Sequence, residues 1–490
     1  MRLTKLVEPP LEFGNAIRHV DIRFGLMDNG PIDFGTEDAP TRVRIGIVGS
    51  AETVEGTAHW LVRCAEGLPP KESRQPNLFP PFPGLGVEGA FRCNFVTAEE
   101  LQRTIPSREL ARLVAIPGQA EVTKAIVEAF AQEIASLAER NAPPHVVLVA
   151  LPMEIIERTF NARSIAAEGE VDVEADDVEK ASGGSDLDFR GMLKAACMKL
   201  RIPIQIMWPT VYDPSLAIAR KLKIESTRKV QDDATRAWNM LTALYYKAGG
   251  LPWRLARDSR QFKTSFVGLS FYRSVDGSEV HTSTAQMFDE RGEGLVLRGG
   301  RAVESAEDRR PHMTAEDAFH LMETSLKVFK QVHGHPPARV VVHKTSKFDR
   351  GELDGINKAL DALAIDRADL IAISKAGTRL YRDGAYPPLR GTYLQLDRDQ
   401  ALLYTRGSVD FFRTYPGMYI PRPLLLRCQA LAQPLQSVAE EVLALTKMNW
   451  NNTQFDNAMP ITVAAARQVG EVLKYVDEGQ EIAPRYSFYM

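Results

Sequence analysis

The chain has 490 residues, of which 44% are hydrophobic, enough for more than one core and a prediction of two to three domains. Its formal net charge of −3 excludes a globally basic nucleic-acid-binding protein, so a polyanion site requires a local cluster of cations. The four cysteines are far apart, which argues against a disulfide framework or a thiolate metal site. No apolar run is long enough to cross a bilayer and no signal-peptide core is present, so we expect a soluble cytoplasmic protein.

The first half of the chain alternates predicted strands and helices after an arm, 1–40, that has little periodicity. Strands are predicted at 44–49, 90–96, 145–151 and 202–208, and helices at 51–65, 119–140, 189–200 and 228–247. This alternation indicates an open, mostly parallel sheet covered by helices. The stretch 165–188 is rich in glycine, serine and acidic residues, which predicts an acidic loop.

The second half has a different pattern, with a predicted hairpin among crossover helices. Strands are predicted at 265–272, 280–288, 294–297, 338–343, 370–374, 392–396, 402–405 and 418–427, and helices at 315–332, 350–363, 435–447 and after Pro460. A mixed sheet follows from this pattern, and the Gly-Gly-Leu-Pro break after Lys247 predicts a domain boundary near residue 250. The aromatic tail is expected to be buried, which would place the α-carboxylate of Met490 in a defined site.

Several short motifs do not indicate a functional site. The run Gly84-Leu-Gly-Val-Glu-Gly89 has the letters of a dinucleotide fingerprint, but a proline-rich loop precedes it and a strand follows it, so that function is excluded. Residues 46–50 sit between a strand and a helix and are only a weak phosphate-site signal. The histidines of the second half, His333, His335 and His343, have no carboxylate at metal-ligand spacing and are interpreted as structural.

A cluster of cations near helix ends is more informative. Arg190 and Lys194 lie one turn apart at the start of a helix whose first residues are aspartates, which is an arrangement suited to an anion. Lys247 stands beside a Gly-Gly turn and aromatic residues. The alternative for the first pair is a solvated helix face, and for Lys247 a cation that complements a helix C-terminus.

The order of several segments resembles the MID–PIWI module of Argonaute proteins. The segments are Lys-Ala-Gly-Gly-Leu-Pro-Trp at 247–253, Ser-Phe-Val-Gly-Leu-Ser at 265–270, Val-Val-Val-His-Lys-Thr at 340–345, Met-Pro-Ile-Thr-Val-Ala-Ala-Ala-Arg at 459–467 and the terminal Tyr-Ser-Phe-Tyr-Met. The resemblance covers roughly residues 40–490 and leaves no room for N and PAZ domains, as in short prokaryotic Argonautes. It implies an α/β fold, with a Rossmann-like MID domain at 41–250 and a ribonuclease H-like PIWI domain at 251–490.

The resemblance also implies that the nuclease centre is degenerate. Active members hold two divalent metals with carboxylates on neighbouring strands. Their first and third aspartates fall here on Ser270 and Thr345, and their last ligand falls on Arg467, while the position of the glutamate stays open. Two hydroxyls and a guanidinium cannot hold hard cations that require anionic oxygens. We therefore expect an inactive PIWI domain and no enzymatic cleavage.

The guide 5′-phosphate pocket of the family falls on Arg190, Lys194, Gln205 and Lys247. These side chains would bind a terminal phosphate through charge-assisted hydrogen bonds. The resemblance implies that the carboxylate of Met490 joins this pocket through a bound Mg²⁺. It also implies a basic channel for a guide–target duplex, for which the candidates are Arg379, Arg382, Arg390, Arg406, Arg413, Arg422 and Lys447.

The resulting hypothesis is a cleavage-incompetent short Argonaute that uses a guide RNA to recognise complementary single-stranded DNA. By resemblance, its partner would be an APAZ-containing effector of the sirtuin or TIR type, bound as a heterodimer that can oligomerise on activation and deplete NAD in defence against plasmids or phage. One alternative is a guide-directed endonuclease that uses displaced carboxylates, the candidates being Asp276, Asp289, Glu290 and Asp349. A second alternative is a scaffold for the partner that needs no nucleic acid.

Overall fold

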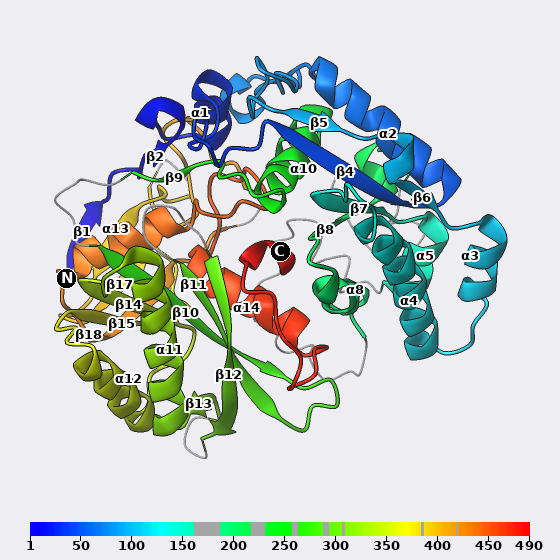
Figure 1. Cartoon of the computed structure of the whole chain (residues 1–490). Helices are drawn as coiled ribbons and strands as arrows, with labels where there is room; N and C mark the ends of the chain where they lie inside the picture. The colour runs from blue at the N-terminus through cyan, green and yellow to red at the C-terminus, as the bar shows by residue number, and fades with distance from the viewer. Residues whose placement is uncertain are drawn as a thin grey trace. The chain divides into compact units, whose positions relative to one another are not determined.

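The structure is a computed structural model of the chain, which forms two compact units (Figure 1). It describes all residues except 161–186, 217–230, 257–262, 288–293, 306–308, 384–386 and 418–419. Unit 1 comprises Met1–Gly25, Trp253–Lys474 and Pro484–Met490, and unit 2 comprises Leu26–Pro252 and Tyr475–Ala483. The predicted arm is therefore divided between the units, and nearly all of the predicted acidic loop, 165–188, lies outside the described residues. No helix in the described part of the chain is long and apolar enough to span a membrane.

Unit 2 is built on a parallel sheet with the strand order β5-β4-β7-β8, and β6 also pairs with β4. The strands are β4 (Arg42–Gly49), β5 (Asn94–Val96), β6 (Gln102–Thr104), β7 (Val146–Ala150) and β8 (Ile204–Met207). The helices are α2 (Ala51–Glu66), α3 (Ser107–Val114), α4 (Gln119–Ala138), α5 (Met153–Thr159), α8 (Phe189–Cys197) and α10 (Asp233–Lys247), with α1 (Ile22–Asn29) at the division between units. The central strand β7 is apolar at every position because both of its faces are covered, as parallel sheets require.

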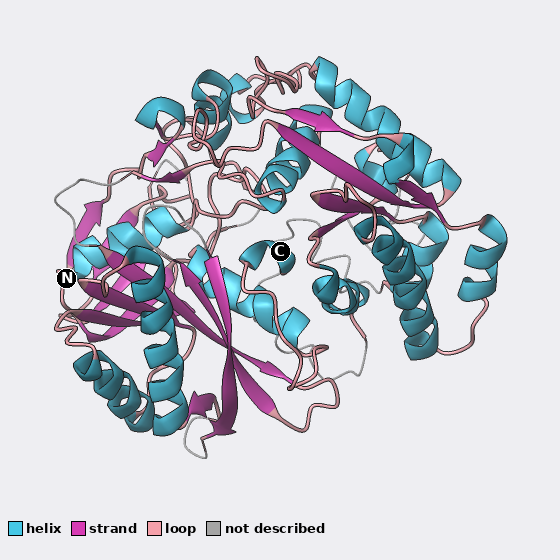
Figure 2. Cartoon of the chain, in the orientation of Figure 1, coloured by secondary structure: helices cyan, strands magenta, loops and turns pink. Residues whose placement is uncertain are grey.

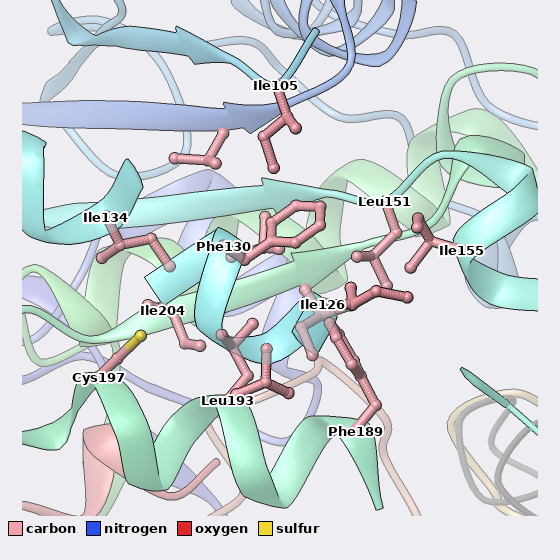
Figure 3. Packing of buried hydrophobic residues seen from close by; sticks show 14 of the residues in the cluster. Ile105, Ile126, Phe130, Ile134, Leu151, Ile155, Phe189, Leu193, Cys197 and Ile204 are labelled. Carbon is pink, nitrogen blue, oxygen red and sulfur yellow. The ribbon is translucent and has the colours of Figure 1, made fainter. Parts of the chain in front are cut away.

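The core of unit 2 fixes the position of α8. Phe189 and Leu193 point from α8 into a cluster that includes Phe130 of α4 and Ile204 of β8 (Figure 3). These two α8 residues are four apart, so they share one face of the helix. Arg190 and Lys194, each directly after one of these apolar residues, therefore stand on another face of a helix that is anchored by its apolar side.

Unit 1 is built on a ten-stranded mixed sheet with the order β1-β16-β17-β18-β15-β14-β10-β11-β12-β13. The strands are β1 (Arg2–Lys5), β10 (Thr264–Arg273), β11 (Val280–Met287), β12 (Gly294–Glu304), β13 (Pro311–Met313), β14 (Arg339–Lys344), β15 (Ala368–Lys375), β16 (Thr392–Gln395), β17 (Gln400–Leu403) and β18 (Leu424–Ala430). The pairs β10–β14 and β14–β15 are parallel, and the other pairs are antiparallel. A smaller sheet contains β2 (Leu11–Glu12), β3 (Arg18–His19) and β9 (Arg254–Leu255).

Helices pack on the large sheet of unit 1, as the cyan helices beside the magenta strands show (Figure 2). They are α11 (Ala315–His333), α12 (Arg350–Ala362), α13 (Leu435–Leu445) and α14 (Ile461–Leu473). Leu269 of β10 belongs to the core formed with α11 and α12. Its neighbour Gly268 faces α14, where an added Cβ would overlap the carbonyl oxygen of Thr462. Neighbouring residues of a strand point to opposite faces, so β10 is covered by helices on both sides.

The predicted elements agree with the structure at most long, periodic segments. The segment 90–96 is a strand only at Asn94–Val96, and the strand predicted from 418 begins at Leu424. The short helices α3 and α5 and the arm strand β1 were not predicted. They are too short for a clear hydrophobic period.

Candidate functional sites

The predicted pocket for the guide 5′-phosphate, called the guide-end site below, comprises Arg190, Lys194, Gln205 and Lys247 and begins at the N-terminus of α8. The carboxylate of Asp188 caps this helix and accepts hydrogen bonds from the amides of Arg190 and Gly191 at 3.2 and 2.9 Å. The amide of Asp188 itself donates to the hydroxyl of Tyr475 at 2.7 Å. Because Asp188 occupies these amides, an anion at this site must be held mainly by side chains.

Lys247 reaches the same region from the last turn of α10. Its side chain is buried, and Nζ donates to the carbonyl of Ile204 at 2.9 Å and to Oε1 of Gln205 at 2.5 Å. Gln205 lies on β8, and both α8 and α10 pack against that strand. The hydrogen bond between Lys247 and Gln205 brings two of the four predicted pocket residues into direct contact.

The charges of the other two predicted residues, Arg190 and Lys194, act on Lys247. Burial lowers the pKa of Lys247 well below its usual value of 10.5, and repulsion by Lys194 and Arg190 lowers it further. Lys194 is buried as well, and Arg190 is half-buried. Three cations close enough to repel one another in a partly buried site are stabilised when an anion binds among them. The structure thus gathers Arg190, Lys194, Gln205 and Lys247.

The predicted Mg²⁺ site is less well matched by the residues of unit 2. Mg²⁺ prefers oxygen ligands, usually including a carboxylate. The charged residues among the four predicted ones are cations, and the amide oxygen of Gln205 accepts from Lys247. The nearby carboxylate of Asp188 already accepts from the amides of Arg190 and Gly191. These residues favour a phosphate over a metal ion. Met490 belongs to unit 1, where it is buried at the end of the chain, and its role as a ligand stays a prediction.

The predicted cleavage positions lie together in unit 1. Leu269 of β10 pairs with Lys344 of β14 in parallel register, so the next residues along each strand, Ser270 and Thr345, are adjacent. Ser270 also pairs with Ser283 of β11. The hydroxyl of Ser283 donates to the carbonyl of Ala466 at 2.7 Å, immediately before Arg467. The three positions that correspond to metal ligands therefore lie on β10, directly after β14 and on α14, and α14 packs against both strands.

Close packing holds α14 against these strands. The absence of a side chain at Gly268 lets the first turn of α14 approach β10. On the next turns, the α-carbon of Gly470 faces Tyr272 and Ser283, and an added Cβ would lie 3.0 and 3.1 Å from their atoms. Arg467 is thus carried by a helix with little freedom to move away from the strand ends.

A buried ion pair lies directly beside the cleavage positions in sequence. Lys344 and Glu352 have no exposed side-chain area, and Nζ donates to both carboxylate oxygens at 2.6 and 2.5 Å. His312, Asp349 and Glu352 are close enough to hold a metal ion. However, the Lys344 ammonium also lies 3.3 Å from Nδ1 of His312, so a cation already compensates this group.

The carboxylates of the endonuclease alternative have other partners where the structure describes them. Asp276 lies in the exposed turn after β10, where hydrogen bonds from Ser274 and Ser278 lower its pKa to about 2. Asp349 caps α12 and accepts from the amide of Glu352 at 2.7 Å. Asp289 and Glu290 lie outside the described residues.

Two predicted channel cations are interior residues. Arg390 and Lys447 both bind Glu8 of the arm, and Lys447 also donates to the carbonyls of Pro9 and Val20. Burial alone would raise the pKa of Glu8, but the two cations outweigh it and lower that pKa. Arg390 and Lys447 therefore anchor the arm to unit 1. The remaining candidates are exposed or half-buried, namely Arg379, Arg382, Arg406, Arg413 and Arg422.

Solved structures resemble the whole chain. An Argonaute of Clostridium butyricum bound to a guide DNA and a target DNA matches 100% of this chain with a TM-score of 0.64 and 16% identity. Aa-Ago with externally bound siRNA matches 99% with a TM-score of 0.60 and 14% identity, and A. aeolicus Argonaute matches 98% with a TM-score of 0.56 and 15% identity. The chain has an Argonaute fold. The predicted α/β class, with Rossmann-like and ribonuclease H-like parts, is confirmed.

The match is limited in length and in sequence. This chain covers 55%, 56% and 54% of those three Argonaute chains, about half of each. No protein-family model matches the sequence, and no curated protein is significantly similar to it. The identities of 14–16% establish the fold alone, so activity and partners must be argued from the sites.

Proposed function

We propose that this chain binds the 5′-phosphate of a guide RNA and uses the guide to recognise complementary single-stranded DNA without cutting it. The observation that carries the proposal is the convergence of Arg190, Lys194, Gln205 and Lys247 in one partly buried cluster of an Argonaute fold. Lysine and arginine donors bind a terminal phosphate dianion through short, charge-assisted hydrogen bonds. The bases of the guide would supply the sequence information through pairing.

The 5′-phosphate is the feature that such a cluster would distinguish. A hydroxyl at the guide end cannot offset the mutual repulsion of Lys194, Lys247 and Arg190, whereas a dianion can. The buried position of the lysines makes this difference larger, because water screens the charges less there. The resemblance further implies a bound Mg²⁺ and a role for the carboxylate of Met490 as its ligand, and both stay predictions.

The absence of cutting is proposed from the residues at Ser270, Thr345 and Arg467. Cleavage by two metal ions needs anionic oxygens on both sides of the scissile phosphate. A guanidinium at the end of the group repels divalent cations, and the neighbouring hydroxyls add no negative charge. The described carboxylates of the endonuclease alternative, Asp276 and Asp349, are bound within their own turn and helix cap. We therefore favour a binding function over an endonuclease.

The proposed output is activation of an associated effector. In this proposal the chain acts as a short Argonaute together with an APAZ-containing protein, as the resemblance of its sequence segments implies. That partner, of the sirtuin or TIR type, would consume NAD when the guide pairs with its target. The proposed compartment of this activity is the cytoplasm.

Copurification tests the binding step. Protein expressed in a bacterial host and purified should carry small RNAs with 5′-phosphates, which radiolabelling before and after phosphatase treatment identifies. Lys194→Ala with Lys247→Ala should remove them, whereas Lys199→Ala, an exposed cation on the same segment, should not. Guides retained by the double variant would show that the pocket is misplaced. Coexpression with the product of the adjacent gene, followed by an NAD assay with and without target DNA, tests the effector.

A further inference from the structure

Asp33 is a buried carboxylate that accepts hydrogen bonds from residues on both sides of Lys247 in sequence. Oδ1 accepts a hydrogen bond from the hydroxyl of Tyr245 at 2.7 Å, 212 residues away in sequence. Oδ2 accepts from the amide of Leu251 at 2.8 Å. The Asp33 side chain is buried. The amide of the preceding residue, Ile32, donates to the carbonyl of Pro252 at 3.1 Å. One short segment of unit 2 thus binds both sides of the turn that follows Lys247.

The turn itself is tightly constrained. The amides of Gly249 and Gly250 donate to the carbonyls of Tyr246 and Tyr245, both at 3.0 Å, which ends α10. Gly249 has a φ of 100°, which favours glycine, and an added Cβ at Gly250 would overlap the Tyr245 ring. The ring of Phe91 stacks on the ring of Tyr245, with the two ring centroids 5.1 Å apart.

A carboxylate is an unfavourable group at this place unless it has a specific role. Burial raises the pKa of Asp33, which reflects the cost of the charged form. The C-terminus of α10 also carries a partial negative charge from the helix dipole, so a neighbouring anion does not stabilise the helix end. What a carboxylate offers here is two acceptor oxygens in a fixed geometry, one for a hydroxyl and one for an amide.

We propose that Asp33 is a positioning residue of the guide-end site, which fixes the last turn of α10 and thereby aims Nζ of Lys247 at the phosphate. Asp33 acts through Tyr245 and Leu251 and does not touch the guide. Lys247 has a long, flexible side chain, so the position of its Nζ depends on how firmly its backbone is held. The hydrogen bonds from Nζ to Ile204 and Gln205 set the direction of the amine. The hydrogen bonds to Asp33 set the position of the backbone that carries it.

This inference rests on the proposed function and predicts a specific loss. The readout is the ratio of the dissociation constants for a 5′-hydroxyl and a 5′-phosphate guide RNA of one sequence. A variant that is only less stable has fewer folded molecules, which weakens both apparent affinities equally and leaves the ratio unchanged. A misplaced Lys247 weakens binding of the phosphorylated guide alone.

The experiment measures this ratio by fluorescence anisotropy for the full chain and four variants. Asp33→Ala removes both acceptors and should lower the ratio about tenfold, the value of one charge-assisted hydrogen bond. Asp33→Asn and Tyr245→Phe each remove one of the two bonds and should lower it less. The matched control is Thr53→Val, which removes another buried, long-range hydrogen bond of unit 2, from the Thr53 hydroxyl to the carbonyl of Ala150 at 2.8 Å, and should leave the ratio unchanged.

Each outcome decides between the two proposals. If wild-type protein prefers the phosphorylated guide and Asp33→Ala keeps that preference, the positioning role is wrong and the guide-end site stands. If Thr53→Val lowers the ratio as much as Asp33→Ala, the loss is not specific to the Asp33 bonds and the positioning role is again wrong. If wild-type protein has no preference for a 5′-phosphate, the guide-end site itself is wrong, and the role of Asp33 falls with it.

Discussion

Replacing Lys247 with methionine should separate guide affinity from folding stability. Methionine has a similar length and keeps the apolar part of the side chain, but it removes the buried amine. A hydrogen bond to a charged group contributes about 1.5–3 kcal/mol, and about 1.4 kcal/mol is a factor of ten at 25 °C. Affinity for a guide with a 5′-phosphate should therefore fall about 10- to 100-fold, while affinity for a 5′-hydroxyl guide changes little.

Stability should respond weakly to the same substitution because opposing effects nearly cancel. The carbonyl of Ile204 and Oε1 of Gln205 lose a donor, which costs about 1–3 kcal/mol for buried acceptors. Against this, the variant no longer buries a charge that Lys194 and Arg190 repel. The net change in the free energy of unfolding should stay below about 2 kcal/mol, smaller than the 3–5 kcal/mol that follows from breaking a compensated buried ion pair.

The assay pairs fluorescence anisotropy of the two guides with urea unfolding of wild type and variant. Lys199→Met removes the same charge from an exposed position of the same unit, so it controls for long-range electrostatics. Equal losses of affinity for both guides, or a phosphate preference that survives in Lys247→Met, would refute the reasoning. So would a large loss of stability, because it would mean that Lys247 has a structural role.

Three further predictions concern unit 1. Burial lowers the pKa of His343 to about 3, so between pH 6.5 and 4 the unfolded chain gains a proton that the folded chain does not. Over this range the free energy of unfolding, measured with urea, should fall by about 3 kcal/mol more for wild type than for His343→Phe. Arg339→Met should cost about 3–5 kcal/mol in the same measurement, because it leaves the fully buried carboxylate of Asp369 without its cationic partner at 2.6 Å. Gly268→Ala should cost about 1–3 kcal/mol and lower Tm, since the new Cβ overlaps Thr462; an unchanged Tm would mean that α14 can move away from β10.

Local patterns were sufficient to predict the elements that carry the sites. The helix period of 189–200, the apolar strand before Gln205 and the Gly-Gly break after Lys247 are signals within a few residues of each other. They predicted α8, β8 and the end of α10, and the resemblance then selected the four pocket residues. The Asp188 cap was also visible in sequence, although its consequence, that the helix amides are occupied, required the structure.

Contacts between distant residues could not be predicted in this way. The bonds from Tyr245 to Asp33 and from Lys447 to Glu8 join residues that are hundreds of positions apart, and no periodicity encodes them. For the same reason Arg390 and Lys447 could not be distinguished from surface cations, and both are buried anchors of the arm. A cation in sequence shows only its charge, whereas its role depends on whether a carboxylate such as Glu8 is brought to it by the fold.

Incubation of the purified protein with a 5′-phosphorylated guide RNA, a complementary single-stranded DNA and Mn²⁺ tests the central claim most directly. One gel-shift reaction, followed by denaturing electrophoresis of the same sample, reports binding and cutting together. The account predicts a guide-dependent complex in which the DNA stays intact. Cuts opposite the centre of the guide, or binding of the DNA that does not require the guide, would contradict it.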